Sequence, residues 1–281
     1  MALSEPGALA CRALVLLALC SLLCACQLPA SRGDITAQPR VDIGVAIGEA
    51  VRTGNCAALP QLLPTTVPAQ QRDELTIPLL RSAYQGLTAC VRHLVEAGAD
   101  VDAPLADGST ALALAARQGH IDVLAYLLDQ GAQVNLANRA GVAALALAAD
   151  QEDGSALALL LRSGANIDAA SVRGWTALHH AVASCRIDPV SQLLAAGARV
   201  DARDRNGNTP LLLAAAACAP AVAPLLDRGA EIDAVETQGM TALMVAAQNR
   251  QTQTMALLLA RGADSSRRDR SGRDFSSWAA R

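Results

Sequence analysis

Residues 108–135 read GSTALALAARQGHIDVLAYLLDQGAQVN, and markers within this stretch recur along the chain at a nearly fixed step. The pair Gly-Ala returns after 33, 33, 33, 32 and 33 residues, beginning at Gly98, Gly131, Gly164, Gly197, Gly229 and Gly262. A glycine that opens each unit keeps the same spacings, at Gly108, Gly141, Gly174, Gly207, Gly239 and Gly272. Two independent registers indicate a repeat array, in which short units stack and expose one continuous surface.

Within a unit, a Thr-x-Leu start is followed by small residues, a Gly-His turn, a Val-x-x-Leu-Leu segment and a Gly-Ala-x-Val-Asn ending. The clearest matches to the start are Thr176-Ala177-Leu178-His179, Thr209-Pro210-Leu211-Leu212 and Thr241-Ala242-Leu243-Met244. This pattern resembles the ankyrin repeat, and the resemblance covers roughly residues 41 to 281. It implies an all-α solenoid of helix-turn-helix units joined by β-turn or hairpin loops.

Each recurring position has a physical role. The hydroxyl of Thr110 precedes an apolar run, so it can accept a hydrogen bond from an otherwise unpaired N–H and start a helix. Ala115 and Ala116 are small where two helices approach, while Leu112 supplies buried apolar area. Gly131 follows the second helix, where glycine takes the left-handed conformation without a Cβ clash.

Two units depart from the pattern. One has Ala143 in place of the capping threonine and Glu152 in place of the turn glycine. Another is one residue short and carries Pro220 and Pro224 in its second helix, where a proline past the first turn costs about 3 kcal/mol. We therefore expect a weakened segment over residues 140–228, with less hydrogen-exchange protection than the units on either side.

The repeats divide the chain beyond residue 40 into three parts. A poorly matching unit with a charged first helix predicts an N-terminal capping repeat over residues 41–72. Six ankyrin repeats follow over residues 73–270. Half a unit predicts a C-terminal cap helix over residues 271–281, in which Phe275 and Trp278 pack on the last full repeat.

The N-terminus has the character of an export signal. Arg12 precedes a 13-residue apolar run that ends at Ala25, and this run is shorter than the roughly 20 residues that a membrane-spanning helix needs. Such a run fits the apolar region of a secretory signal, which we assign to residues 1–25. Residues 26–40 contain prolines, glycine and serine and are expected to be a flexible tether.

The end of this signal, Leu23-Cys24-Ala25-Cys26, resembles the bacterial lipobox. The resemblance implies that Cys26 is lipidated and becomes the mature N-terminus, and Gln27 after it implies the outer membrane. We therefore expect a periplasmic domain that meets the membrane only through its N-terminal lipid anchor. The alternative is conventional cleavage nearby, with Cys26 left unmodified.

Four cysteines remain beyond the signal and Cys26, and an oxidising compartment favours their pairing. Cys56 and Cys90 fall at nearby positions of adjacent units, so we expect a disulfide between them. Cys185 and Cys218 occupy equivalent positions, where a helix spacing of about 8–10 Å exceeds the usual Cα separation of a disulfide. That pair would require the turns to bend together. The spacings do not contain the C-x-x-C of a zinc site, so we expect no metal.

The remaining chemistry argues against an enzyme. His179 and His120 occupy positions that the ankyrin resemblance assigns to structural hydrogen bonds, and His93 stands alone on a second helix. Hydrolase, zinc-protease and P-loop motifs do not occur. We therefore expect no catalytic residue and no cofactor. All 23 basic residues are arginine, and the net charge of −3 argues against a nucleic-acid partner.

The expected binding surface is the concave face, formed by the turn tips and the exposed side of the first helices. Six residues after the opening glycines stand Leu114, Leu147, His180, Leu213 and Val245. Trp175 is notable because aromatic residues form only 2% of the chain, although it could instead pack on the neighbouring turn. The candidate partner-binding residues are Tyr84, Arg117, Arg173, Trp175, His180, Asn208 and Met240.

These features predict a monomeric protein–protein interaction module of the bacterial envelope that holds or protects an exported enzyme. The alternative is an inhibitor or immunity protein that blocks a toxin or lipase in the same compartment. A third hypothesis, a hydrolase with diverged motifs, would depend on His93, His120 and His180.

Overall fold

The computed structural model describes residues 43–63 and 73–280. The chain divides into two units, Met1–Arg40 and Val41–Arg281. The assigned signal, Cys26 and the assigned tether lie outside the described residues, as do residues 64–72 of the expected N-terminal cap.

In its described residues, the second unit is built from six helix pairs with further helices on either side. The inner helices are α4 (Thr76–Gln85), α6 (Ala111–Gln118), α8 (Ala144–Ala148), α10 (Ala177–Ala183), α12 (Pro210–Ala217) and α14 (Ala242–Gln248). The outer helices are α5 (Thr88–Glu96), α7 (Ile121–Asp129), α9 (Ser155–Arg162), α11 (Ile187–Ala195), α13 (Ala219–Asp227) and α15 (Thr252–Ala260). The flanking elements are α2 (Ile43–Arg52), the 3-10 helix η1 (Cys56–Ala58), α3 (Leu59–Leu62) and α16 (Phe275–Ala279).

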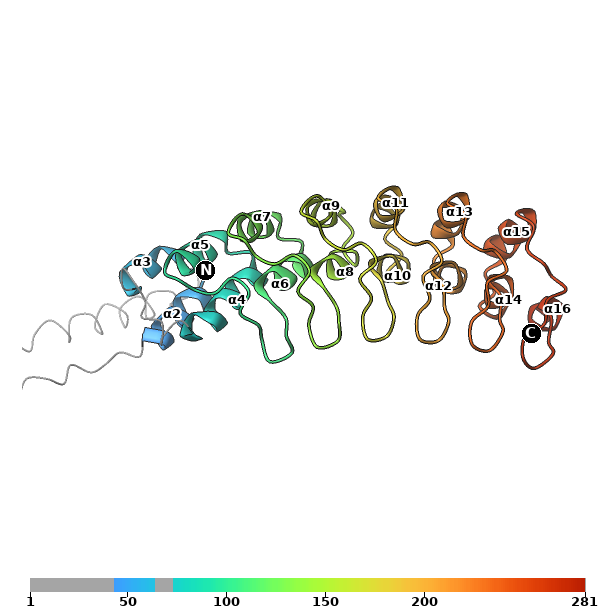
Figure 1. The fold of residues 1–281 in the computed structure, drawn as a ribbon, viewed down its shortest axis with the longest axis horizontal. Coiled ribbons are helices and arrows are strands. Elements are labelled where there is room, and N and C mark those ends of the chain that lie inside the picture. The colour runs from blue at the N-terminus through green and yellow to red at the C-terminus, as the bar shows by residue number, and fades with distance from the viewer. Residues whose placement is uncertain (1–42, 64–72, 281) are drawn as a thin grey trace, which may run out of the picture. The chain divides into compact units, whose positions relative to one another are not determined.

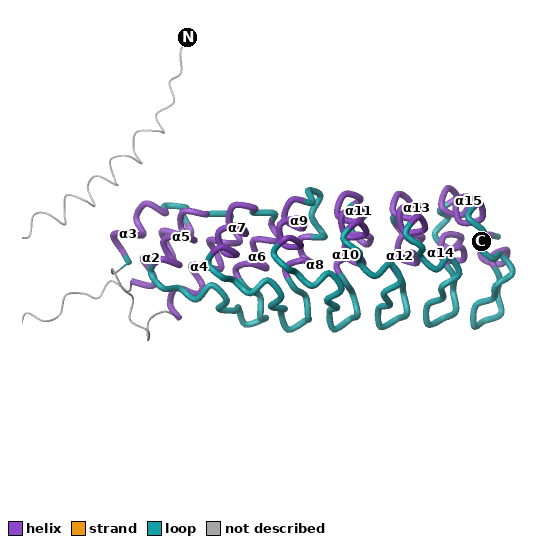
Figure 2. Tube along the Cα trace, turned by 45° about the horizontal axis from the view of Figure 1, so that its top comes forward, coloured by secondary structure: helices purple, strands orange, loops and turns teal. Residues whose placement is uncertain are grey.

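The inner and outer helices form two parallel rows, and each inner helix contacts the next one (Figure 1). A loop that we call a finger runs from each outer helix to the next inner helix and projects away from the outer row (Figure 2). Over the described residues the fold contains no β-strand, and two isolated bridges, Ala137 with Ala143 and Val235 with Thr241, mark the feet of two fingers. The expected all-α solenoid is confirmed.

The helix starts follow the capping residues of the sequence. Thr110, Thr209 and Thr241 each accept a hydrogen bond from the N–H three residues on, at 3.3–3.4 Å. Ala143 has the same extended backbone but no side-chain bond, and α8 is five residues long where α6 has eight. The missing cap therefore coincides with a shortened helix.

The two prolines of α13 differ in their effect. Pro220 lies in the first turn, where its missing N–H has no intrahelical partner to lose, so the expectation of a cost at this residue is wrong. Pro224 lies inside the helix and removes one hydrogen bond. The helix still runs unbroken to Asp227.

Successive fingers are joined by a ladder of backbone hydrogen bonds. One residue near each fingertip donates its N–H to a carbonyl of the preceding finger. The bonds are Arg139 to Asp107 (2.8 Å), Val172 to Ala140 (2.8 Å), Arg205 to Arg173 (2.9 Å), Thr237 to Asn206 (2.9 Å) and Arg270 to Gln238 (2.9 Å). The opening glycines permit this approach. At Gly174, with φ +80°, an added Cβ would lie 2.9 Å from the Cα of Asp204.

A second ladder uses the Asp or Asn that closes each Gly-Ala-x-x-Asp/Asn segment. Its side-chain oxygen accepts the N–H of a residue 30 or 31 positions on, in the next repeat. The pairs are Asp102 with Gln133, Asn135 with Asn166, Asp168 with Arg199, Asp201 with Glu231 and Asp233 with Asp264, all at 2.8–3.0 Å. Neighbouring repeats are therefore joined by hydrogen bonds in two places, near the fingertips and at the Asp or Asn of each Gly-Ala-x-x-Asp/Asn segment.

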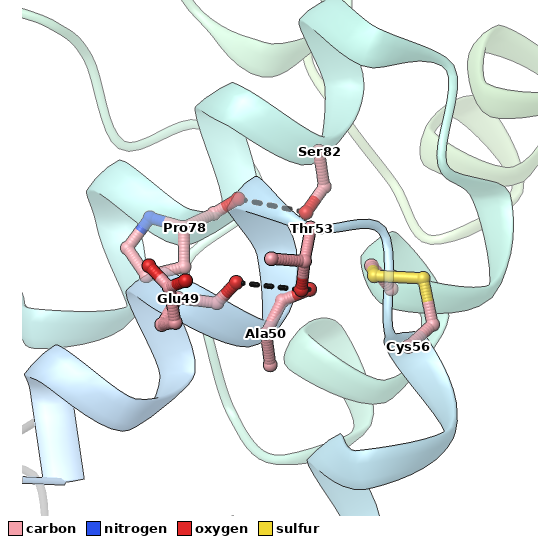
Figure 3. Close-up of a disulfide and its surroundings, with 7 residues drawn as sticks. Glu49, Ala50, Thr53, Cys56, Pro78 and Ser82 are labelled. Atoms are coloured by element: carbon pink, nitrogen blue, oxygen red, sulfur yellow. Dashed lines mark hydrogen bonds between the residues drawn. A yellow bond between two sulfur atoms is a disulfide. The ribbon is translucent and has the colours of Figure 1, made fainter. Parts of the chain in front are cut away.

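Two disulfides also connect adjacent repeats. Cys56 of η1 bonds Cys90 of α5 with a Cα separation of 4.8 Å, beside α2 and α4 (Figure 3). Cys185 bonds Cys218 with a Cα separation of 5.3 Å. The helix spacing does not prevent this second bond, because Cys185 lies in a turn with φ +52° and Cys218 lies at the junction of α12 and α13.

His179 ties a helix start to the next finger. Its Nδ1 accepts from the Thr176 N–H at 3.2 Å, and its Nε2 lies 3.2 Å from the Asn208 carbonyl oxygen. These partners assign a neutral ring with the proton on Nε2. Burial lowers the pKa of His179 below its ordinary value, against an opposing contribution from the Asn208 carbonyl. The fold therefore favours the uncharged imidazole.

We expect Gly174→Ala to destabilise the array more than Gly131→Ala does. Both glycines have a left-handed backbone, which costs a non-glycine residue about 1–2 kcal/mol. Only Gly174 faces backbone of the next finger, whereas nothing lies within 4 Å of a Cβ at Gly131. The clash should add roughly 1–3 kcal/mol to the loss in free energy of unfolding. Urea unfolding of both variants measures the loss in free energy of unfolding. Equal losses in the two variants would show that contact between fingers does not require glycine at position 174.

Lowering the pH should reduce the free energy of unfolding, because protonation of His179 favours the unfolded chain. Its folded-state pKa is depressed, so the unfolded chain binds its proton first, near the ordinary pKa of about 6.5. The contribution of His179 to the free energy of unfolding is therefore fully present above that pH, and it declines as the pH falls toward the folded-state pKa. Urea unfolding between pH 7.5 and 5 measures the decline in the wild type and in His179→Asn, and an NMR titration of the His179 ring gives its pKa. Parallel stability curves with an ordinary pKa would refute this expectation.

Candidate functional site

The inner face, which we define as the exposed flank of the inner helices with the adjoining fingers, carries a row of partly buried side chains. Its members recur at the sixth position after the opening glycines: Leu114, Leu147, His180, Leu213 and Val245. Toward the N-terminus the same spacing reaches Arg81 of α4 and Gly48 of α2. The four apolar members pack on the core with one side and reach solvent with the other, so they form an apolar strip that is interrupted by His180 of α10.

The N-terminal end of this row is hollowed. A depression of about 400 Å³ lies between α2 and α4, lined by Gly44, Val45, Gly48, Glu74, Ile77, Pro78 and Arg81. Val45 and Ile77 are 67% and 55% exposed. The absence of a side chain at Gly48 leaves the floor of the hollow open.

Trp175 lies beside the row at the foot of the finger that precedes α10. Its indole Nε1 donates to Asp204 Oδ2 of the next finger at 3.2 Å. The ring meets His180 edge to face with centroids 5.2 Å apart, and it stacks near His179 at 6.3 Å. Trp175 is therefore partly buried between two fingers, and the remainder of its ring adjoins His180 on the inner face.

Asp150 adds a charged group to the same region. Its Oδ1 accepts from Ser184 Oγ at 2.8 Å, its Oδ2 lies 3.3 Å from His180 Nδ1, and its carbonyl accepts from Arg186 Nε at 3.2 Å. Partial burial alone would raise the pKa of Asp150, but the hydrogen bonds from His180 and Ser184 lower it overall. The carboxylate stays ionised at neutral pH and links α8 to the repeat of α10.

Ser184, His180 and Asp150 are the residue types of a hydrolase triad, but their arrangement is different. In a triad the imidazole takes the hydroxyl proton and the carboxylate orients the imidazole. Here the Ser184 hydroxyl donates to Asp150 itself. This cluster is a hydrogen-bonded connection between repeats, without a histidine positioned to activate the hydroxyl.

Tyr84 and Arg117 extend the inner face toward the N-terminus. Both side chains are exposed; Arg117 stands nine residues after its opening glycine, and Tyr84 occupies the equivalent position of the preceding inner helix. Their carbonyl oxygens contact the next repeat, since His120 Nε2 lies 3.0 Å from Tyr84 O and Gln151 Nε2 donates to Arg117 O at 2.6 Å. The His120 ring also covers Gly86, where an added Cβ would lie 2.7 Å away. His120 has a structural position, as its place in the repeat predicts.

Two candidate residues are engaged in packing and bonding. Met240 is 9% exposed and packs with Met244, Ala247 and Trp278, because the C-terminal cap folds over it, so its assignment to the binding surface does not hold. Asn208 is partly buried, and its amide donates to Asp204 Oδ2 at 3.0 Å. Its carbonyl accepts from His179, so Asn208 shapes a finger.

Several residues of this face do not stand out in the sequence as candidates for binding. Asp150, which contacts His180, belongs to no recurring motif. Asp204, which binds the Trp175 indole, stands three residues before an opening glycine, where most fingers have a polar residue that accepts the N–H two residues on, so this recurrence was an available signal. Arg139 and Arg205 are exposed at fingertips, as the predicted Arg173 is. A detectable signal was the residue two places before each opening glycine, which is arginine in three of the six fingers.

A metal site and a membrane-spanning helix were sought among the described residues. Over residues 43–63 and 73–280, no cluster of three His, Cys, Asp or Glu side chains is arranged to hold a metal ion. In the same residues no helix combines the length and apolar composition that crossing a bilayer requires.

Known proteins share this architecture. The family model for ankyrin repeats (3 copies) matches residues 47–138, 145–236 and 188–269. Among solved structures, the crystal structure of the human ASB11 ankyrin repeat domain is 27% identical, with a TM-score of 0.67, and the match covers 72% of this chain and 91% of that one. No curated protein sequence matches this chain. The family match, together with the stacked helix pairs and their fingers, shows that the chain belongs to the ankyrin repeat family.

Proposed function

We propose that this chain is a protein-binding module of the bacterial cell envelope and that it holds its partner on the inner face. The observation that carries the proposal is the row of partly buried side chains, apolar except for His180, that runs from α6 to α14 beside the fingers. Ankyrin repeats typically bind another protein and are generally not catalytic. A strip that is apolar yet open to solvent suits a partner that covers it.

Rigidity supports this use of the face. The finger ladder and the Asp/Asn ladder hold each repeat against the next, so the contact residues are positioned before a partner arrives. Binding to such a surface requires little additional ordering of the protein. Trp175 and Arg173 add residue types that often dominate binding energy.

Two observations support the envelope as the location. The first is the apolar N-terminal run followed by Cys26 in a lipobox-like sequence. The second is independent of that run, because all four cysteines between residues 43 and 280 are joined in disulfides. Disulfides persist in oxidising compartments such as the periplasm. An anchored chain would present its inner face to proteins of that compartment.

The consequence of binding divides the proposal into two cases. A partner that stays active in the complex is held or protected. A partner that loses activity makes this chain an inhibitor or immunity protein. Turnover by the captured partner, measured with and without this chain, separates the cases.

Obstructing the inner face should abolish partner binding. Ala183 and Ala217 are exposed on α10 and α12, so Ala183→Gln/Ala217→Gln adds bulk there without removing a packing group. Ala125→Gln/Ala195→Gln makes the same change on the outer helices α7 and α11. In affinity capture from envelope extracts, the wild type and the outer variant should recover a common partner, and the inner variant should recover at least tenfold less. Equal recovery by all three proteins would contradict the proposal.

Removing the proposed anchor should release the protein from the membrane. We expect Cys26→Ser to shift the chain from the membrane fraction to the soluble periplasmic fraction, because a single lipid-modified residue is the proposed attachment. Fractionation and metabolic labelling with a radioactive fatty acid measure the change. A wild-type protein that takes up no label and is already soluble would refute the lipid anchor, while binding through the inner face could still be correct.

A further inference from the structure

The fingertips carry an excess of positive charge in a chain whose net charge is negative. The tips, defined as the two residues before each opening glycine, are all exposed. They are Ala106-Asp107, Arg139-Ala140, Val172-Arg173, Arg205-Asn206, Thr237-Gln238 and Arg270-Ser271. The tips therefore contain four arginines and one aspartate, whereas the whole chain has a net charge of −3.

Of these four arginines, Arg139 interacts electrostatically with the carboxylate of Asp107, and no ion pair in the described part of the chain neutralises the other three. None of them forms an ion pair there, whereas arginines near the finger feet do, such as Arg273 with Asp269 at 3.0 Å. Asp107 is already engaged, because its two oxygens accept the N–H and the hydroxyl of Ser109, each at 2.9 Å. The fingertip charge is thus available to a partner.

The acidic residues next to the fingertip arginines point inward. Asp204 and Asp269 are 9% and 6% exposed. In each case one oxygen accepts the N–H groups two and four residues on, at 2.8–3.0 Å. The other oxygen accepts an indole N–H, from Trp175 or Trp278, at 3.2 Å. These carboxylates order the fingers from within and leave the tips basic.

The fingertip arginines are held in a fixed register. Arg139, Arg205 and Arg270 donate their own backbone N–H to the preceding finger, and Arg173 accepts through its carbonyl. Three consecutive fingers and the last one therefore present a guanidinium group along one edge, with the steps between repeats about 8–10 Å long. Beside this edge lies the apolar strip of the inner face, which includes Leu147 and Leu213.

We propose that the partner of the inner face is a protein segment that presents carboxylate side chains to the fingertip arginines and apolar side chains to the strip between them. This inference rests on the proposed binding function and specifies the chemistry of the partner. Arginine binds carboxylates through paired N–H donors, which gives such contacts directional specificity.

A protein fits this surface better than a nucleic acid does. The positive groups are spaced one per repeat, whereas each strand of a DNA duplex carries a phosphate about every 3.4 Å. Apart from His180 the adjacent row is aliphatic, and the indole of Trp175 beside it is bonded to Asp204, so the face does not present a series of aromatic rings on which successive bases could stack. Asp150 lies on the same face and would repel a phosphate backbone.

Selection from a displayed library of random peptides on the full-length chain tests the inference. We expect the recovered peptides to be enriched in Asp and Glu together with Leu, Ile or Phe. Arg139→Gln/Arg205→Gln should weaken binding of a recovered peptide roughly tenfold and reduce its salt dependence. The matched control Arg162→Gln/Arg199→Gln removes the same charge from two exposed arginines that are not at a fingertip, and it should bind like the wild type.

The outcomes separate the inference from the proposed function. Peptides without acidic enrichment, or equal binding by the fingertip variant, would overturn the inference. The proposed function would survive that result if Ala183→Gln/Ala217→Gln still blocked binding. A library that yields no peptide sensitive to this inner-face variant would count against both. Phosphatidylglycerol vesicles and oligodeoxythymidine are further probes, and binding of either that exceeds peptide binding and requires Arg139 and Arg205 would overturn the protein assignment.

Discussion

Contact between neighbouring repeats is the constraint on which this structure depends, because a single helix pair cannot cover its own apolar side. Each inner helix has alanines on the side where the next one packs, such as the fully buried Ala115 and Ala214. The backbone bonds between fingers and the Asp/Asn ladder then set the register from one repeat to the next. A continuous outer surface follows from this internal regularity, and the candidate site is a property of the stack and not of any one repeat.

Local signals explain why much of the fold could be predicted from the sequence. Threonine before an apolar run starts three of the inner helices through a bond to a nearby N–H, and Ala143 lacks it, as expected. The glycine periods reflect backbone geometry, since the opening glycines have positive φ and most face the next finger closely. Such interactions involve neighbours in sequence or an equivalent residue one period away, so a repeating pattern reveals them.

The candidate site was harder to predict because its side chains find partners across repeats. Met240 has the spacing of a surface residue, yet the C-terminal cap supplies Trp278 to cover it. Trp175 is both packed and exposed, because Asp204 draws its indole toward the next finger. The Cys185–Cys218 bond does not follow from the spacing of packed helices, because one cysteine lies in a turn and the other at a helix junction. Periodicity locates such residues but does not identify their contacts.

The Cys56–Cys90 bond also makes the two ends of the array unequal in their resistance to unfolding. Terminal repeats of a stack contact only one neighbour, so unravelling normally begins at either end. Here the first repeat is covalently fastened to the capping segment before it, whereas no described disulfide lies beyond Cys218 and α16 is only five residues long. Fraying and proteolytic attack on the array should therefore start at the C-terminal end and move toward the clamped one, which keeps the repeats nearest the N-terminal segment folded longest.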